Sequence, residues 1–111
     1  MTTFVYLGNY TPDGLKGAMQ DGFEARVSAV RELIEAHGGE LVKMGFCMGD
    51  FDFIIVADIA DRKAALLAPM IAGASGTVSV STIELISASE MSEIANMARV
   101  AQFKVAGTAS E

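Results

Sequence analysis

The chain has 111 residues, of which 51% are hydrophobic and 20% charged, and it carries a net charge of -6 at pH 7. This length suits one domain with a hydrophobic core. The apolar content argues against a disordered chain, and it is slightly high for a monomer of this size. The negative charge and the scattered Lys and Arg residues argue against an electrostatic grip on nucleic-acid phosphates.

A cytoplasmic location is the expectation from cysteine usage and the N-terminal sequence. The single cysteine, Cys47, has no partner for an internal disulfide, and no basic and then apolar signal-peptide pattern begins the chain. The longest apolar runs have the length of strands, so we expect no membrane span. Because His37 is the only histidine, a multi-histidine metal site within one chain is excluded, and we expect no metal and no cofactor.

A strand and a helix start are predicted at the N-terminal end. Within FVYLGNY (4–10), aromatic residues of one parity alternate with aliphatic residues of the other, which is typical of a strand that uses both faces. Thr11 is a good N-cap and Pro12 a good first helical residue, but Gly14 and Gly17 weaken the turn that follows. We therefore expect a short, irregular helix here.

A second, amphipathic helix is predicted to begin at Phe23. Apolar side chains recur there every three or four residues as far as Ile34, whereas the charged side chains lie mostly elsewhere on the helical wheel. His37 followed by Gly38 and Gly39 ends this helix, because glycine adopts the left-handed conformation of a C-cap and a cation near the last carbonyls is favourable.

A hairpin is predicted in the middle of the chain. Two strand-like runs, residues 40–48 and 51–58, are separated only by Gly49-Asp50. So short a connection predicts a tight two-residue turn.

The next predicted helix begins with Asp61 as N-cap and ends before Gly73 or Gly76. Pro69 lies inside it and lacks the N–H that would bond to residue 65, so we expect a kink or a stop there.

A strand and an extra helix complete the pattern. Residues 77–86 alternate Val with Ser, and Ser87 with Glu90 then fits a capping box at the start of the last helix. That helix carries an apolar stripe that includes Met91, Ile94 and Ala98.

The order of elements predicts an α+β fold: a ferredoxin-like βαββαβ plait with a four-stranded antiparallel sheet, followed by an extra C-terminal helix. Residues 1–90 would form the domain, and residues 91–111 the extra helix and a loose tail. Both crossover helices would cover one face of the sheet. The other face would be apolar and open, so we expect it to mediate self-association into a dimer or trimer or to meet the last helix or a ligand.

Two stretches, FVYLGNYTPDGLKG and MGDFDFIIV, together with the order of elements, resemble the GYD domain family of small bacterial and archaeal proteins. The resemblance covers roughly residues 3–90. The Gly, Tyr, Asp signature falls on Gly49, Phe51 and Asp52, with Asp50 interposed and phenylalanine in the place of the typical tyrosine. The resemblance implies a ferredoxin-like fold similar to dimeric α/β barrel proteins, and no established reaction.

Four residues are candidates for contact with a small-molecule ligand: Tyr6, Tyr10, Phe51 and Asp52. Asp52 either accepts structural hydrogen bonds or faces a pocket, because burying a carboxylate without a partner is costly. The two tyrosines on the neighbouring strand could be its partners, or they could serve packing alone. No group of side chains identifies a catalytic centre.

Three functions follow as hypotheses. The first is a non-catalytic, homo-oligomeric protein that binds a small molecule or has an accessory or regulatory role. The alternative is a cofactor-independent enzyme of the dimeric α/β barrel type, an oxygenase or isomerase acting on a small apolar compound in a pocket between sheet and helices. That alternative predicts a closed cavity with a polar group inside.

The third hypothesis is a protein-interaction module that exposes the apolar stripe of the last helix. The sequence leaves open whether the chain is an enzyme.

Overall fold

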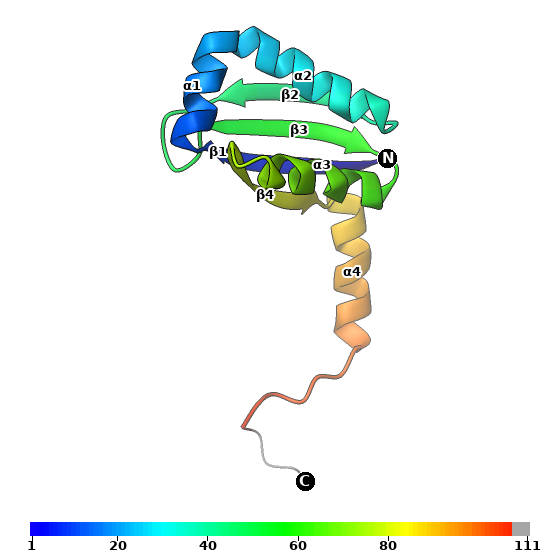
Figure 1. The fold of residues 1–111 in the computed structure, drawn as a ribbon. Coiled ribbons are helices and arrows are strands. Elements are labelled where there is room, and N and C mark those ends of the chain that lie inside the picture. The colour runs from blue at the N-terminus through cyan, green and yellow to red at the C-terminus, as the bar shows by residue number, and fades with distance from the viewer. Residues whose placement is uncertain (108–111) are drawn as a thin grey trace.

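The computed structural model describes residues 1–107 and shows a four-stranded sheet, helices on one of its faces and a projecting C-terminal helix (Figure 1). The elements in chain order are β1 (Thr2–Tyr10), α1 (Pro12–Asp21), α2 (Phe23–Ala36), β2 (Glu40–Phe46), β3 (Phe53–Ile59), α3 (Arg62–Ala74), β4 (Val78–Leu85) and α4 (Ala88–Val100). The strands are antiparallel and follow the order β2-β3-β1-β4. The predicted α+β class, antiparallel sheet and extra C-terminal helix are therefore confirmed.

The first crossover differs from the prediction. Two helices, α1 and α2, connect β1 to β2, so the order of elements is not strictly βαββαβ. The predicted irregularity of α1 is wrong, since α1 is a helix of ten residues. Thr11 Oγ1 accepts a hydrogen bond from Gly14 N–H at 3.1 Å, which caps the helix as its sequence predicts.

Gly14 allows α1 to approach the start of β4. Thr11 N–H donates to Thr77 O at 2.9 Å, and a Cβ on Gly14 would lie only 1.9 Å from the same carbonyl oxygen. The lack of a side chain at Gly14 is therefore what permits this contact. This contact links the end of β1 and the start of α1 to the residue that precedes β4.

The connection between β2 and β3 is longer than predicted, because it comprises residues 47–52. The two-residue turn at Gly49-Asp50 is therefore wrong. Cys47 N–H donates to Asp52 O at 2.8 Å and closes the base of this loop. The other hydrogen bonds of Asp52 go to β1, as described below. Asp52 is therefore held by contacts with β1, and it does not continue the ladder between β2 and β3 as predicted.

Alternation along the strands separates a covered face from an uncovered one. α2 packs against β2, and α3 packs mainly against β4, on the same face of the sheet (Figure 1). The buried core lies beneath them and consists of Phe4, Tyr6, Ile34, Phe53, Ile55, Ala57, Ile59 and Ala65. The opposite face, here called the open face, is not covered by α1, α2 or α3. Its aliphatic side chains are Val5, Leu7, Ile54, Val56, Ile83 and Leu85.

The last helix, α4, projects away from the sheet, and none of its residues is buried (Figure 1). Ser87 Oγ accepts a hydrogen bond from Glu90 N–H at 3.1 Å, which confirms the predicted helix start. Met91 and Ile94 of the predicted stripe are 55% and 45% exposed. Residues 101–107 follow without helix or strand. The end of the predicted loose tail, residues 108–111, lies outside the described residues.

Candidate functional site

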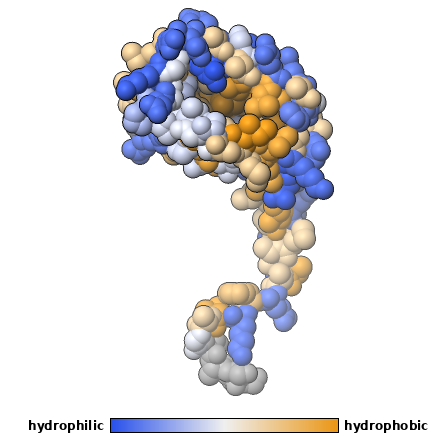
Figure 2. All heavy atoms as spheres, in the orientation of Figure 1, coloured by the Kyte–Doolittle hydropathy of each residue, from blue (hydrophilic) through white to orange (hydrophobic). Residues whose placement is uncertain are grey.

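A cavity of about 300 Å³ lies between α2, α3 and the covered face of the sheet. Its size is near the lower end of the roughly 300–1,000 Å³ of small-molecule sites in proteins. Figure 2 shows an apolar hollow in the face of the domain that carries these helices. The cavity is therefore accessible from outside and large enough for a small organic molecule.

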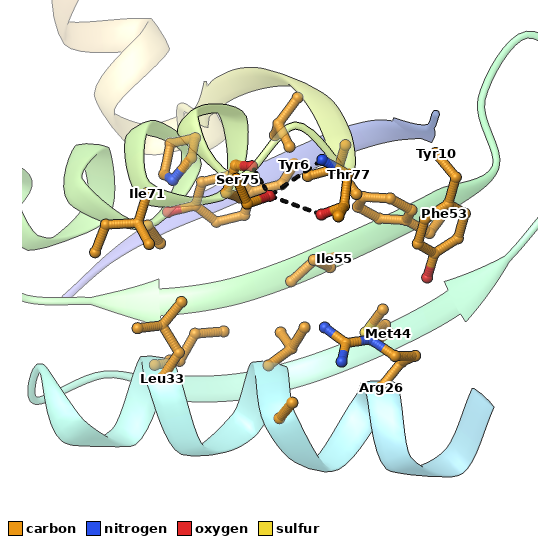
Figure 3. Close-up of a pocket in the computed structure, with 18 residues that line it drawn as sticks. Tyr6, Tyr10, Arg26, Leu33, Met44, Phe53, Ile55, Ile71, Ser75 and Thr77 are labelled. Atoms are coloured by element: carbon orange, nitrogen blue, oxygen red, sulfur yellow. Dashed lines mark hydrogen bonds between the residues drawn. The ribbon is translucent and has the colours of Figure 1, made fainter. Parts of the chain in front are cut away.

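One wall of the cavity comes from α2. Five of its residues line the space: Arg26, Ala29, Val30, Leu33 and Ile34. Their spacing of three, one, three and one places them on one side of a helix with 3.6 residues per turn. This wall is aliphatic except at its N-terminal end, where Arg26 lies (Figure 3).

The opposite wall is α3, and Tyr6 holds it in place. Pro69 has no N–H, so the carbonyl of Ala65 lacks its helical donor. Tyr6 Oη supplies the missing hydrogen bond and donates to Ala65 O at 2.7 Å. The helix consequently continues through Pro69 to Ala74, and it does not stop at the proline. Burial raises the pKa of Tyr6, which keeps the hydroxyl protonated for this role.

Aromatic rings form the floor of the cavity near the end of β1 (Figure 3). The Phe53 ring lies over Gly8, where a Cβ would be 2.0 Å from a ring carbon. Tyr10 packs against Phe53 with ring centroids 5.1 Å apart and planes inclined by 53°. Gly8 thus creates the place for the Phe53 ring, and this ring supports Tyr10.

The polar groups of the cavity differ in whether they already form hydrogen bonds within the protein. Ser75 Oγ donates to Ala72 O at 2.6 Å and lies 2.7 Å from Thr77 Oγ1, so these two hydroxyls already form hydrogen bonds within the protein (Figure 3). Arg26 and Tyr10 lie at another end of the cavity. Burial raises the pKa of Tyr10, the guanidinium of Arg26 beside it acts in the opposite direction, and the Asp52 carboxylate adds to the rise.

Two of the four predicted site residues, Tyr6 and Tyr10, line the cavity, whereas Phe51 and Asp52 lie in the β2–β3 loop and are not among its lining residues. The Asp52 carboxylate accepts a hydrogen bond from Tyr10 N–H at 2.9 Å. Asp52 N–H donates to Gly8 O at 2.8 Å. Asp52 therefore acts as a structural acceptor that fixes the end of β1 from which Tyr10 enters the cavity.

Sequence reasoning missed Arg26 and the whole α3 wall. A signal for Arg26 was available, because it begins the series with Ala29, Val30 and Leu33 that has the spacing of one helix face. Because Arg26 is charged, the sequence pattern groups it with the side chains that lie mostly off the apolar stripe of this helix. For α3, the periodicity of apolar residues predicts which side faces the sheet, but it does not predict a cavity between that side and the sheet.

Residues 1–107 contain no group of three or more His, Cys, Asp or Glu side chains arranged to hold a metal ion. None of the helices in this part of the chain combines the length and the apolar character that crossing a membrane requires.

The family model described as the GYD domain matches residues 4–95. The chain belongs to the GYD domain family. This confirms the family that the sequence resembles, and the matched residues include most of the sheet, the helices α1, α2 and α3, and the first part of α4. Comparisons with curated proteins and with solved structures found no match.

The contact between Tyr6 and Ala65 in this GYD domain predicts an energetic coupling with Pro69. Tyr6→Phe should lower the free energy of unfolding by about 1–3 kcal/mol, because it leaves a buried carbonyl without a donor. In a Pro69→Ala background, the restored N–H can bond to Ala65 O, so Tyr6→Phe should cost clearly less. A double-mutant cycle measured by urea denaturation tests this, and equal costs in the two backgrounds would contradict the coupling.

Proposed function

We propose that this GYD domain protein binds a small, mainly apolar molecule in the cavity between α2 and α3, and that it does so without catalysing a reaction. The observation that carries the proposal is an accessible cavity of about 300 Å³ with predominantly aliphatic and aromatic walls. Such a surface gains free energy when an apolar ligand displaces water from it.

The groups around the cavity favour binding over catalysis. Within the described part of the chain, its lining residues include no Asp, Glu, His or Cys, which are the usual general bases and nucleophiles near neutral pH. The Tyr6 hydroxyl is already bonded to Ala65 O, and burial raises the pKa of both Tyr6 and Tyr10. A cofactor-independent oxygenase or isomerase of the dimeric α/β barrel type would need a base here, so this second candidate has less support.

The arrangement of the sheet supports placing this domain among the ferredoxin-like plaits. The strand order β2-β3-β1-β4, with helical crossovers on one face, is the arrangement that such a plait requires. We interpret α1 as an addition to the first crossover, held against β4 by the close approach at Gly14.

Partly filling the cavity should weaken ligand binding. Ala29→Leu adds side-chain volume inside the cavity, so we expect the affinity for prodan, a neutral naphthalene fluorophore, to fall about tenfold or more, or about 1.4 kcal/mol. Ala25→Leu is the matched control, because Ala25 is exposed on the same helix and does not line the cavity. Fluorescence titration measures both variants. Equal affinities for the two would place the prodan site elsewhere and contradict the proposal.

We further propose that a second copy of the chain covers the open face. Ile54, Ile83 and Leu85 are 38%, 45% and 55% exposed on this face, and exposed apolar patches of this kind mark association surfaces. Lys43 and Asp58 lie on the same face and carry opposite charges, which suits a self-complementary twofold contact. The exposed stripe of α4 is a second apolar surface available to the partner copy, in agreement with the interaction role considered for this helix.

A charge on the open face should prevent this association. We expect the wild type to sediment as a dimer at micromolar concentration and Ile83→Glu to sediment as a monomer, because burying the new carboxylate is costly. Met70→Glu is the control, since Met70 is exposed on α3 away from the open face. A wild type that remains monomeric at micromolar concentration would overturn this proposal.

A further inference from the structure

We infer that the ligand of the cavity is a small amphipathic carboxylate whose apolar body lies between α2 and α3 and whose carboxylate pairs with Arg26. This inference rests on the proposed binding function and names the chemical class of its ligand. It comes from a single cationic group at one end of a mainly apolar cavity.

Among the residues in 1–107 that line the cavity, Arg26 is the only charged one. Its side chain is 38% exposed, and its guanidinium lies 3.9 Å from the carboxylate of Asp21, which is itself 57% exposed. That separation is longer than a hydrogen bond, and a pair at the surface is worth little in water. The guanidinium therefore keeps N–H donors for a ligand, and its planar fork matches the two oxygens of a carboxylate.

Tyr10 adds a second donor at the same end of the cavity (Figure 3). Its hydroxyl lies beside the Arg26 guanidinium and is protonated at neutral pH, so it can donate to an anion placed there. The Asp52 carboxylate, which would repel an anion, accepts Tyr10 N–H at 2.9 Å and does not line the cavity. Arg26 and Tyr10 thus form a polar end that presents donors and one positive charge.

The other described residues that line the cavity carry no charge. The other end of the cavity is formed by aliphatic side chains, among them Leu33 and Ile71 (Figure 3). The hydroxyls of Ser75 and Thr77 are bonded to each other. A ligand with one anionic group and an apolar body matches this distribution, whereas a sugar or a dianion would leave polar groups without partners.

The test compares cinnamate with cinnamamide, which have the same shape and differ in charge. Isothermal titration calorimetry of the wild type should show cinnamate bound about tenfold or more tightly. Arg26→Gln should remove this preference and leave the affinity for cinnamamide nearly unchanged. Arg31→Gln, at an exposed position of the same helix outside the cavity, should retain the preference and so controls for net charge.

The outcomes separate this inference from the proposed function. If the wild type binds both compounds equally and Arg26→Gln changes neither affinity, the inference is overturned and the binding cavity stands. If neither compound nor prodan binds to the wild type, the proposed function fails as well. If Arg26→Gln does not unfold cooperatively, Arg26→Lys replaces it, and a several-fold loss of preference is expected because an ammonium group cannot form the bidentate contact. An unchanged preference in that variant would contradict the role of Arg26.

Discussion

The hydrogen bond from Tyr6 Oη to Ala65 O ties α3 to strand β1 of the sheet. Pro69 creates the need for this bond, because it removes the helical donor of Ala65, and the tyrosine satisfies it from the central strand β1 at 2.7 Å. α3 is thereby anchored over β1 and β4, whereas α2 packs on β2 at the opposite edge. The two helices cover the outer parts of the sheet and leave the cavity above its centre. A proline that would ordinarily weaken a helix thus becomes part of the wall of the cavity.

The two faces of the sheet would serve the two proposed roles separately. Side chains of one parity form the core and the floor of the cavity, and side chains of the other parity form the open face. Since ligand and partner copy would bind on opposite faces, neither blocks the other. Asp52 does not line the cavity, and its hydrogen bonds with Tyr10 N–H and Gly8 O tie the end of β1 to the β2–β3 loop. Asp52 therefore supports the end of β1 from outside the cavity.

Local signals in the sequence predicted most of the elements. The caps at Thr11, Asp61 and Ser87 could be predicted because each side chain bonds to backbone within its own first turn. The β2–β3 loop could not, because Asp52 makes its hydrogen bonds to a strand that is distant in sequence. Tyr6 and Tyr10 were found from strand alternation, which fixes the face of a side chain. Arg26 was missed because its entry into the cavity depends on how α2 rotates against the sheet, and tertiary contacts set this rotation.

The most direct test of the central claim is a titration of prodan into protein labelled at its alanine and isoleucine methyl groups, followed by nuclear magnetic resonance. The account predicts saturable chemical-shift changes at Ala29, Ile55 and Ile71, whose side chains line the cavity, with the open-face residues Ile54 and Ile83 unchanged. Changes confined to Ile54 and Ile83, or no saturable change at all, would contradict it.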